Sequence, residues 1–241
     1  MELMSAPFVW RRLHSLMGLF IVLFLIEHLT TNSQAALLIG ENGAGFIRAV
    51  NFIKNLPYLP VIELLLFAVP TGYHAALGSK YAISGRPNSV ATSGASPSLP
   101  QYGRNQAYTW QRLTSWILLL GIIGHVAYMR FYLYPTHAVS GVRSAYFVRV
   151  HQDDGLAAVA KRLGVSLYNE GDVDREVRQL RLYNDPYEEE WVRALAKRPL
   201  RSGEVIAEAD NFGTVTLLNV RNSFQNVWTC ILYTIFVVSA V

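Results

Sequence analysis

Cysteine and charged residues are scarce in this sequence. Cys230 is its one cysteine, which excludes a disulfide framework, a multi-cysteine iron–sulfur site and the C-x-x-C-H attachment of c-type haem. Charged residues make up 16% of the chain, against about 25% in an ordinary soluble domain. Because 51% of the residues are hydrophobic, the shortage of charge indicates a membrane protein.

The charged residues that are present gather in the segment 137–222, which holds twelve basic and thirteen acidic residues. Their signs are mixed and they show no metal-ligand or nucleophile spacing, so the segment is predicted to be a solvated cap or an assembly surface. Within it we expect helices at 157–164, 173–182 and 188–196 and a strand at 215–220. Outside this segment the carboxylate residues are Glu2, Glu27, Glu41 and Glu63.

Four apolar segments approach the roughly 20 residues that a helix needs to cross a bilayer core. They are 13–29, 59–78, 113–134 and 227–241. We therefore predict an all-α, polytopic transmembrane helix bundle with a small polar α or α+β insertion. The predicted parts are the membrane helices in 1–136, the insertion in 137–222 and a further helix starting in 223–241. Because the fourth segment is 15 residues long and has no stop signal, we expect the sequence to end partway through a span.

Basic residues predict the orientation, since Lys and Arg accumulate on the cytoplasmic side of a membrane. Arg11 and Arg12 precede the first segment, and Lys80, Arg86, Arg104 and Arg112 surround the loop between the second and third. The N-terminus and the loop 84–105 are therefore predicted to be cytoplasmic, and the loop 34–56 and the insertion to face outward. A signal peptide is the alternative for the first segment, but a removable segment has no reason to contain the polar pair Glu27-His28.

Three histidines lie in three different apolar segments, where a coordinating side chain is costly to place and therefore a functional candidate. At about 1.5 Å per helical residue, His28 and His125 both lie about 25 Å from the cytoplasmic face, whereas His74 lies near that face. Two imidazoles at one depth are typical of a b-type haem between helices. Gly18 and Gly121, on the faces of His28 and His125, would let a flat macrocycle approach, although small residues also serve helix packing. A zinc site is the rival interpretation, but it needs three or four ligands at one depth.

Other polar residues in or beside the spans are candidates for supporting roles. Glu63 lies 11 residues before His74, where a buried carboxylate is suited either to carry protons or to form an interhelical hydrogen bond. Arg11, Arg12 and Arg112 are suited to bind haem propionates through charge-assisted hydrogen bonds. Their simpler role is to anchor the spans at the interface.

Several of these motifs together resemble a known family. The segments 11–16, with Gly18, and 24–29 read RRLHSL and FLIEHL and resemble the first helix of the di-haem cytochrome b subunit of bacterial succinate dehydrogenase and fumarate reductase. The similarity covers 8–134 and continues at Leu56-Pro57, Glu63, Pro70, Tyr73-His74-Ala75, Gln111-Arg112-Leu113-Thr114 and His125-Val126.

The resemblance implies five membrane helices around two b haems, in the cytoplasmic membrane of a bacterium. It implies electron transfer between an iron–sulfur subunit on the cytoplasmic side and a membrane quinone, often menaquinone, with the dicarboxylate chemistry on a flavoprotein subunit. It assigns His28 and His125 to the outer haem and His74 to the inner one. The family's fourth ligand would follow Ala240-Val241, so His74 has no partner in this sequence.

The resemblance also places further residues around the haems. His14 and Ser15, with Arg11, Arg12 and Arg112, are expected to bind the haem propionates or to hydrogen-bond the haem ligands. The insertion 137–222 replaces what is a short outer loop in the family, and we do not expect His137 or His151 to be ligands.

Two other functions remain open from the residues alone. A haem-free transporter would use the intramembrane histidines and Glu63 as a proton relay, and it predicts no haem absorbance. A haem-free anchor or assembly subunit would act through the insertion, and it predicts that changes to the histidines have little effect.

Overall fold

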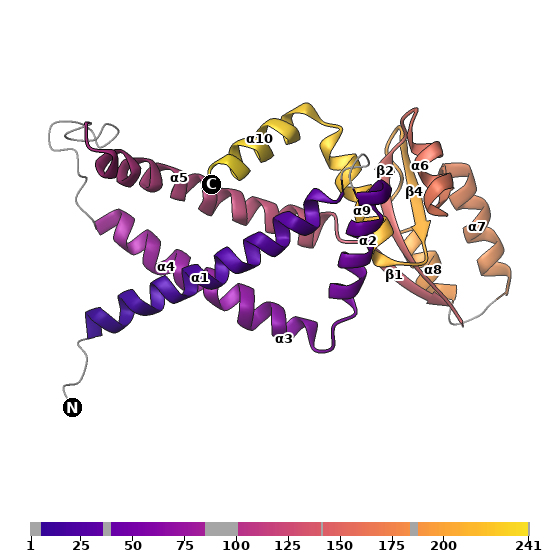
Figure 1. Ribbon diagram of the computed structural model, residues 1–241. Helices are drawn as coiled ribbons and strands as arrows, with labels where there is room; N and C mark the ends of the chain where they lie inside the picture. Colours follow the sequence, from indigo (N-terminus) through magenta and orange to yellow (C-terminus); the bar gives the residue numbers. More distant parts are fainter. Residues whose placement is uncertain (1–5, 36–39, 85–100, 141, 184–187, 241) are drawn as a thin grey trace. The chain divides into compact units, whose positions relative to one another are not determined.

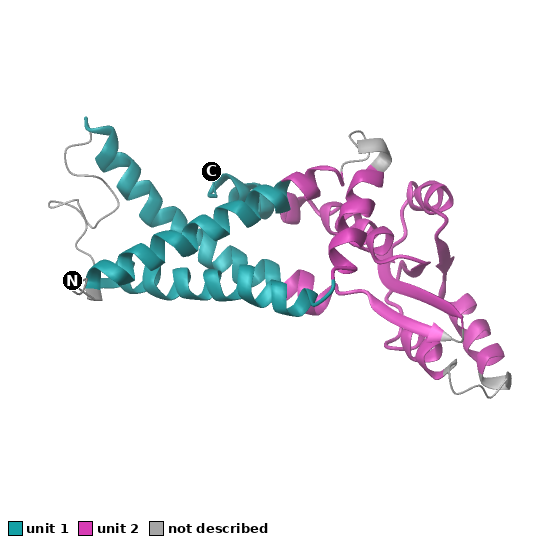
Figure 2. Ribbon diagram, turned by 60° about the horizontal axis from the view of Figure 1, so that its bottom comes forward, with its two compact units in different colours: residues 1–29, 57–126, 231–241 teal, residues 30–56, 127–230 magenta. Residues whose placement is uncertain are grey.

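The computed structural model of the chain describes residues 6–35, 40–84, 101–140, 142–183 and 188–240 (Figure 1). The chain divides into two compact units (Figure 2). Unit 1 comprises 1–29, 57–126 and 231–241, and unit 2 comprises 30–56 and 127–230. The predicted loop 84–105 lies mostly outside the described residues.

Among the described helices, three are long and apolar enough to cross a membrane: Pro7–Ser33, Leu59–Ser84 and Gly103–Tyr132. They contain α1 (Ala6–Ser33), the run α3 (Leu59–Glu63), η1 (Leu64–Ala68) and α4 (Val69–Ser84), and the run α5 (Gly103–Val126) and η2 (Ala127–Tyr132). A shorter apolar helix, α10 (Val227–Val238), follows near the end. Almost none of the residues in the three long spans is buried within the chain, as expected of helices whose apolar side chains face lipid or other helices. The predicted helical membrane architecture is confirmed.

The second span widens into π-helix at η1, just before Pro70. Proline has no amide N–H and clashes with the carbonyl four residues earlier, so a regular helix cannot continue through it without adjustment. The wider turn of η1 relieves this conflict while the span continues as one helix from Leu59 to Ser84. Pro70 itself is buried.

Unit 2 is built around a four-stranded antiparallel sheet in the order β1-β2-β4-β3. The strands are β1 (Thr136–Ser140), β2 (Arg143–His151), β3 (Ser166–Tyr168) and β4 (Glu204–Ala209). Its helices are α2 (Gly40–Lys54), α6 (Leu156–Leu163), α7 (Glu170–Tyr183), α8 (Glu188–Leu195) and α9 (Phe212–Phe224). The insertion is therefore α+β, and the helices expected at 157–164, 173–182 and 188–196 are confirmed.

Both faces of the sheet are covered, because alternate residues of its strands enter two different hydrophobic clusters. Val148 and Val150 of β2 pack with α6 and α9 on one face, whereas Ala145 and Phe147 pack with α8 on the other. Trp191 of α8 is 2% exposed and meets Phe147 edge to face, with ring centroids 5.1 Å apart. These two cores make unit 2 a three-layered body with a buried sheet.

Two sequence predictions for this part of the chain are wrong. The run 215–220 is not a strand but the middle of α9, whose first turn is capped by the Asn211 side chain accepting a hydrogen bond from the Thr214 amide at 2.9 Å. Its β-branched residues suit a buried helix as well as a strand, and periodicity alone does not separate the two in so short a run. The predicted loop 34–56 contains the helix α2, which packs against α9.

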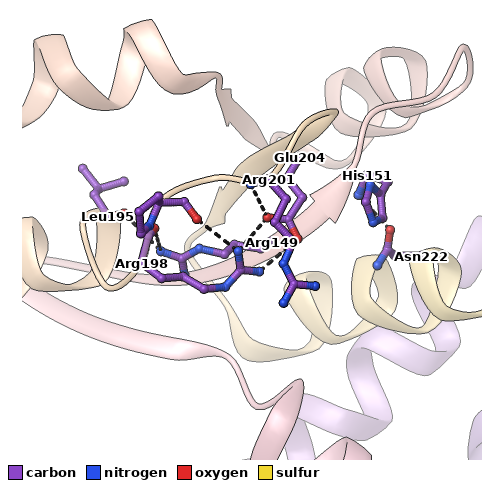
Figure 3. Close-up of polar contacts among 8 residues, drawn as sticks. Arg149, His151, Leu195, Arg198, Arg201, Glu204 and Asn222 are labelled. Atoms are coloured by element: carbon purple, nitrogen blue, oxygen red, sulfur yellow. Dashed lines mark hydrogen bonds and ion pairs between the residues drawn. The ribbon is translucent and has the colours of Figure 1, made fainter.

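Two ion pairs join separate segments of unit 2. Arg198 donates to both oxygens of Glu204 at 2.7 and 2.9 Å, while Arg149 donates to the carbonyls of Leu195 and Arg198 (Figure 3). The hydrogen bonds from Arg198 lower the pKa of Glu204 to about 2. Arg221 binds both oxygens of Asp153 at 2.6 and 2.7 Å and holds its pKa well below the usual range.

Candidate functional site

The imidazole rings of His28 and His125 lie next to each other within unit 1. His28 lies on α1 and His125 lies in the last turn of α5, and their ring centroids are 5.8 Å apart with the rings at 79°. A metal–imidazole bond of about 2 Å on each side places two such centroids about 6 Å apart. The structure thus brings together the two histidines expected at one depth, at a separation that fits axial coordination of one iron from both sides.

Aromatic side chains surround this histidine pair. Phe24, one turn before His28 on α1, stacks on it with centroids 5.3 Å apart. From α10, Tyr233 meets the His125 ring edge-on at 5.7 Å, and Phe236 lies 6.1 Å from it. Such apolar walls exclude water, which is one of the means by which a protein sets a haem potential.

The Nδ1 atom of His125 lies 2.9 Å from the Tyr233 hydroxyl. Sequence reasoning missed this contact because a tyrosine in an apolar run is usually an interface residue. The available signal was the spacing of Tyr233 and Phe236, which places both rings on one face of α10.

The space beside Gly121 was predicted to admit a flat macrocycle, but an aromatic side chain of this protein occupies it. A Cβ atom on Gly121 would lie 2.4 Å from Cδ2 of Phe236, so glycine at this position lets α10 pack closely on α5. Gly18 likewise faces the His74 ring, whose Cε1 atom would lie 3.0 Å from an added Cβ. Both glycines allow aromatic packing between helices, which is the packing role weighed for them above.

His74 lies against His14 rather than alone. Their rings stack with centroids 4.0 Å apart and an interplanar angle of 13°, and His74 Nδ1 lies 3.1 Å from the backbone carbonyl oxygen of His14. This separation is shorter than the roughly 6 Å needed for an iron between two rings, so in this arrangement His14 and His74 would not both bind one iron as axial ligands. Nε2 of His14 is buried and has no hydrogen-bond partner among the described residues.

The other candidates occupy the ends and sides of the same helices. Arg11 is exposed, Arg12 lies over the Phe8 ring at 5.1 Å, and the Ser15 hydroxyl donates to the Arg11 carbonyl at 3.1 Å. Arg112 donates to the Ala82 carbonyl at 2.7 Å, which ties the end of α4 to α5. Glu63, the last residue of α3, is half-buried.

The donor set distinguishes between a haem and a metal bound by side chains alone. Among the described residues, no group of three or more His, Cys, Asp or Glu side chains lies close enough to hold a metal ion. Zinc needs three or four such ligands, whereas a b-type haem brings four nitrogens of its own and needs two axial groups. The pair of His28 and His125 therefore fits the two axial positions of haem iron better than it fits zinc.

Comparison with known proteins gives one informative similarity. The chain is 34% identical over 123 residues to the succinate dehydrogenase cytochrome b558 subunit of Bacillus subtilis (strain 168). The match covers 51% of this chain and 55% of that protein, so the chain spans about half the length of its relative. No family model and no solved structure matches the chain. The resemblance expected from the sequence motifs is therefore confirmed, and over about half of its length this membrane protein is a homologue of a succinate dehydrogenase cytochrome b558 subunit.

Proposed function

We propose that this chain is a b-type cytochrome of the membrane, which anchors a succinate:quinone oxidoreductase and passes electrons between its iron–sulfur subunit and quinone. The observation that carries the proposal is that the rings of His28 and His125, on two membrane-length helices, lie with their centroids 5.8 Å apart. Haem iron, when bound, supplies one-electron chemistry at that point. The homology supports the same assignment, since the relative is a cytochrome b subunit of a succinate dehydrogenase.

His28 and His125 would hold one haem through their neutral imidazoles. His74 would supply one axial ligand to a second haem, because its Nδ1–H can donate to the His14 carbonyl and thereby leave Nε2 to bind iron. Arg11, Arg12 and Ser15 lie in the N-terminal part of α1 and Arg112 lies in the N-terminal half of α5. Their charges and hydroxyl are suited to hold haem propionates.

The partners and the orientation follow from the same proposal. In the bacterial inner membrane, the N-terminus of the chain would face the cytoplasm. A flavoprotein and an iron–sulfur subunit would bind on that same side. The membrane substrate would be a quinone, menaquinone by the resemblance, and Glu63 would move protons to it. The flavoprotein would carry out the oxidation of succinate or the reduction of fumarate.

The test is an optical comparison of membranes that contain the complex with the wild-type chain, with His28→Ala or with His125→Ala. Each substitution should remove the same low-spin b-type signal from the reduced-minus-oxidised spectrum, because each takes one axial ligand from the same iron. His151→Ala serves as the control, since His151 is an exposed residue of β2 outside the apolar helices.

The outcomes separate the competing functions. Survival of the full haem signal in both variants would rule out the proposed pairing. A wild-type complex without haem would reject the cytochrome altogether and favour a transporter with a His/Glu relay or a haem-free anchor.

A further inference from the structure

The hydrogen bond between Tyr233 and His125 joins two helices that lie far apart in the sequence. Tyr233 Oη lies 2.9 Å from His125 Nδ1, and the two residues are 108 positions apart. Both belong to unit 1, Tyr233 on α10 and His125 on α5. The contact reaches the ring nitrogen that faces away from any metal bound at Nε2.

The position of the ring proton on His125 decides which residue donates in this hydrogen bond. A neutral histidine carries one ring proton, so Nε2 can bind iron only when the proton is on Nδ1. In that tautomer His125 donates from Nδ1 and the Tyr233 hydroxyl oxygen accepts. The opposite tautomer, in which the tyrosine donates to Nδ1, leaves Nε2 protonated and unable to coordinate.

Contact of the Phe236 ring of α10 with Gly121 of α5 accompanies this hydrogen bond. The Phe236 ring fills the space that a side chain at Gly121 would occupy, since an added Cβ there would lie 2.4 Å from Phe236 Cδ2. Phe236 and Tyr233 meet edge to face at 6.2 Å, and both rings lie beside His125. Gly121 one turn before His125 therefore allows the approach that brings Tyr233 within hydrogen-bond distance.

We propose that Tyr233 is a positioning residue that stabilises the iron-binding tautomer of His125, by accepting a hydrogen bond from its Nδ1, and tunes the haem held by His28 and His125; this rests on the proposed function. A hydrogen-bond acceptor at Nδ1 makes the imidazole a stronger donor to the metal. Stronger donation favours ferric over ferrous iron, so Tyr233 lowers the reduction potential of that haem.

The test is an optical redox titration of the complex with the wild-type chain and with Tyr233→Phe. The phenylalanine keeps the ring packing and removes only the hydroxyl. One haem should titrate at a higher midpoint potential, and haem at that site should bind roughly 10–100-fold more weakly. The affected signal should be the one that His28→Ala removes. Tyr108→Phe is the matched control, because Tyr108 lies on the same α5 as His125 and is 44% exposed.

The results distinguish this inference from the proposed function. If the wild-type complex contains the haem and Tyr233→Phe leaves its potential, spectrum and affinity unchanged, the role of Tyr233 is refuted and the cytochrome stands. Equal loss of every haem signal in Tyr233→Phe would also refute it, because it would show a general packing role. Absence of haem from the wild-type complex would reject the proposed function itself.

Discussion

Two histidines of the apolar helices have a ring nitrogen held by a neighbour, and the neighbours differ in kind. His125 meets the Tyr233 hydroxyl, whereas His74 meets the backbone carbonyl of His14. A carbonyl only accepts, so it allows one tautomer of His74. A hydroxyl can accept or donate, so the tautomer of His125 also depends on what the iron demands at Nε2. A substitution can remove the Tyr233 hydroxyl, but no substitution removes the backbone carbonyl of His14.

At the same scale, Glu63→Gln tests the proposed path of protons to quinone. Glutamine keeps the size and hydrogen-bonding capacity of glutamate but cannot exchange a proton, so quinone-linked turnover should fall roughly 100-fold while haem content stays normal. Succinate oxidation with a soluble dye, which bypasses quinone, serves as the control and should be unchanged. Normal quinone turnover in Glu63→Gln would return this residue to a packing role.

At the residue scale, the sequence allowed the depth of a helical side chain to be predicted. Helix rise predicts the height of a side chain, and the two histidines that it puts at one depth, His28 and His125, have ring centroids 5.8 Å apart in the structure. It does not predict which way a helix is turned, so the stacking of His14 on His74 was out of its reach. The contact of Tyr233 was not predictable for another reason: its spacing from Phe236 puts both rings on one face of α10, but it does not tell that this face meets a histidine 108 positions earlier.

At the scale of elements, the insertion shows where patterns mislead. The strands β2 and β4 are buried on both faces, so they lack the alternation that marks a half-exposed strand. The run 215–220 has β-branched residues and yet lies in a helix, because Asn211 caps it and its surroundings bury it on most sides. The long apolar helices were predictable, since length and composition alone identify them.

The helix pair α2 and α9 makes a testable element-level contact. A Cβ atom on Gly213 would lie 2.6 Å from the backbone oxygen of Ile47, and the Gly213 amide donates to Asn51 Oδ1 at 2.7 Å. Gly213→Ala should therefore push the helices apart and destabilise unit 2 by about 1–3 kcal/mol. Hydrogen exchange of the α2 and α9 amides should accelerate accordingly.

A matched alanine substitution separates this clash from a general effect of replacing glycine. Gly171→Ala lies in α7 of the same unit, and its Cβ would make ordinary contact with Asn169 Oδ1 at 3.4 Å. In Gly171→Ala, hydrogen exchange of the α2 and α9 amides should stay at the wild-type rate. Equal protection in Gly213→Ala and wild type would contradict the tight contact.

At the scale of the whole molecule, the two units depend on different forces. Unit 1 contains the long apolar spans with hardly any buried residues, so its helices rely on the membrane and on packing between spans. Unit 2 has two hydrophobic cores and ion pairs between its segments. Conditions that titrate carboxylates should therefore act on unit 2 first.

Acid should destabilise unit 2 through Glu204 and Asp153. Their pKa values are lower in the folded chain than in the unfolded one, because Arg198 and Arg221 bind the ionised forms. The stabilisation is complete above the ordinary carboxyl pKa of about 4 and is lost as the pH falls toward about 2. Digestion of the complex with pepsin should show cleavage in 143–209 rising over that range.

Removing the two charges should remove the pH dependence. In Glu204→Gln combined with Asp153→Asn, unit 2 should be less stable near neutral pH and should change little between about pH 5 and pH 2. Glu189→Gln is the control, since its ion pair with Arg193 is long at 3.8 Å and exposed on both sides and contributes little. A wild-type acid response in the double variant would contradict the assignment to these pairs.

The position of Tyr233 after the insertion sets an order of events during synthesis. His125 leaves the ribosome 108 residues before the tyrosine that contacts its ring, a delay of roughly 5–20 seconds at synthesis rates of about 5–20 residues per second. During that interval the ribosome makes the strands β1 to β4, and α5 is in the translocon or the bilayer without α10. A nascent chain thus has time to bring α1 beside α5 before α10 arrives with the Tyr233 hydroxyl.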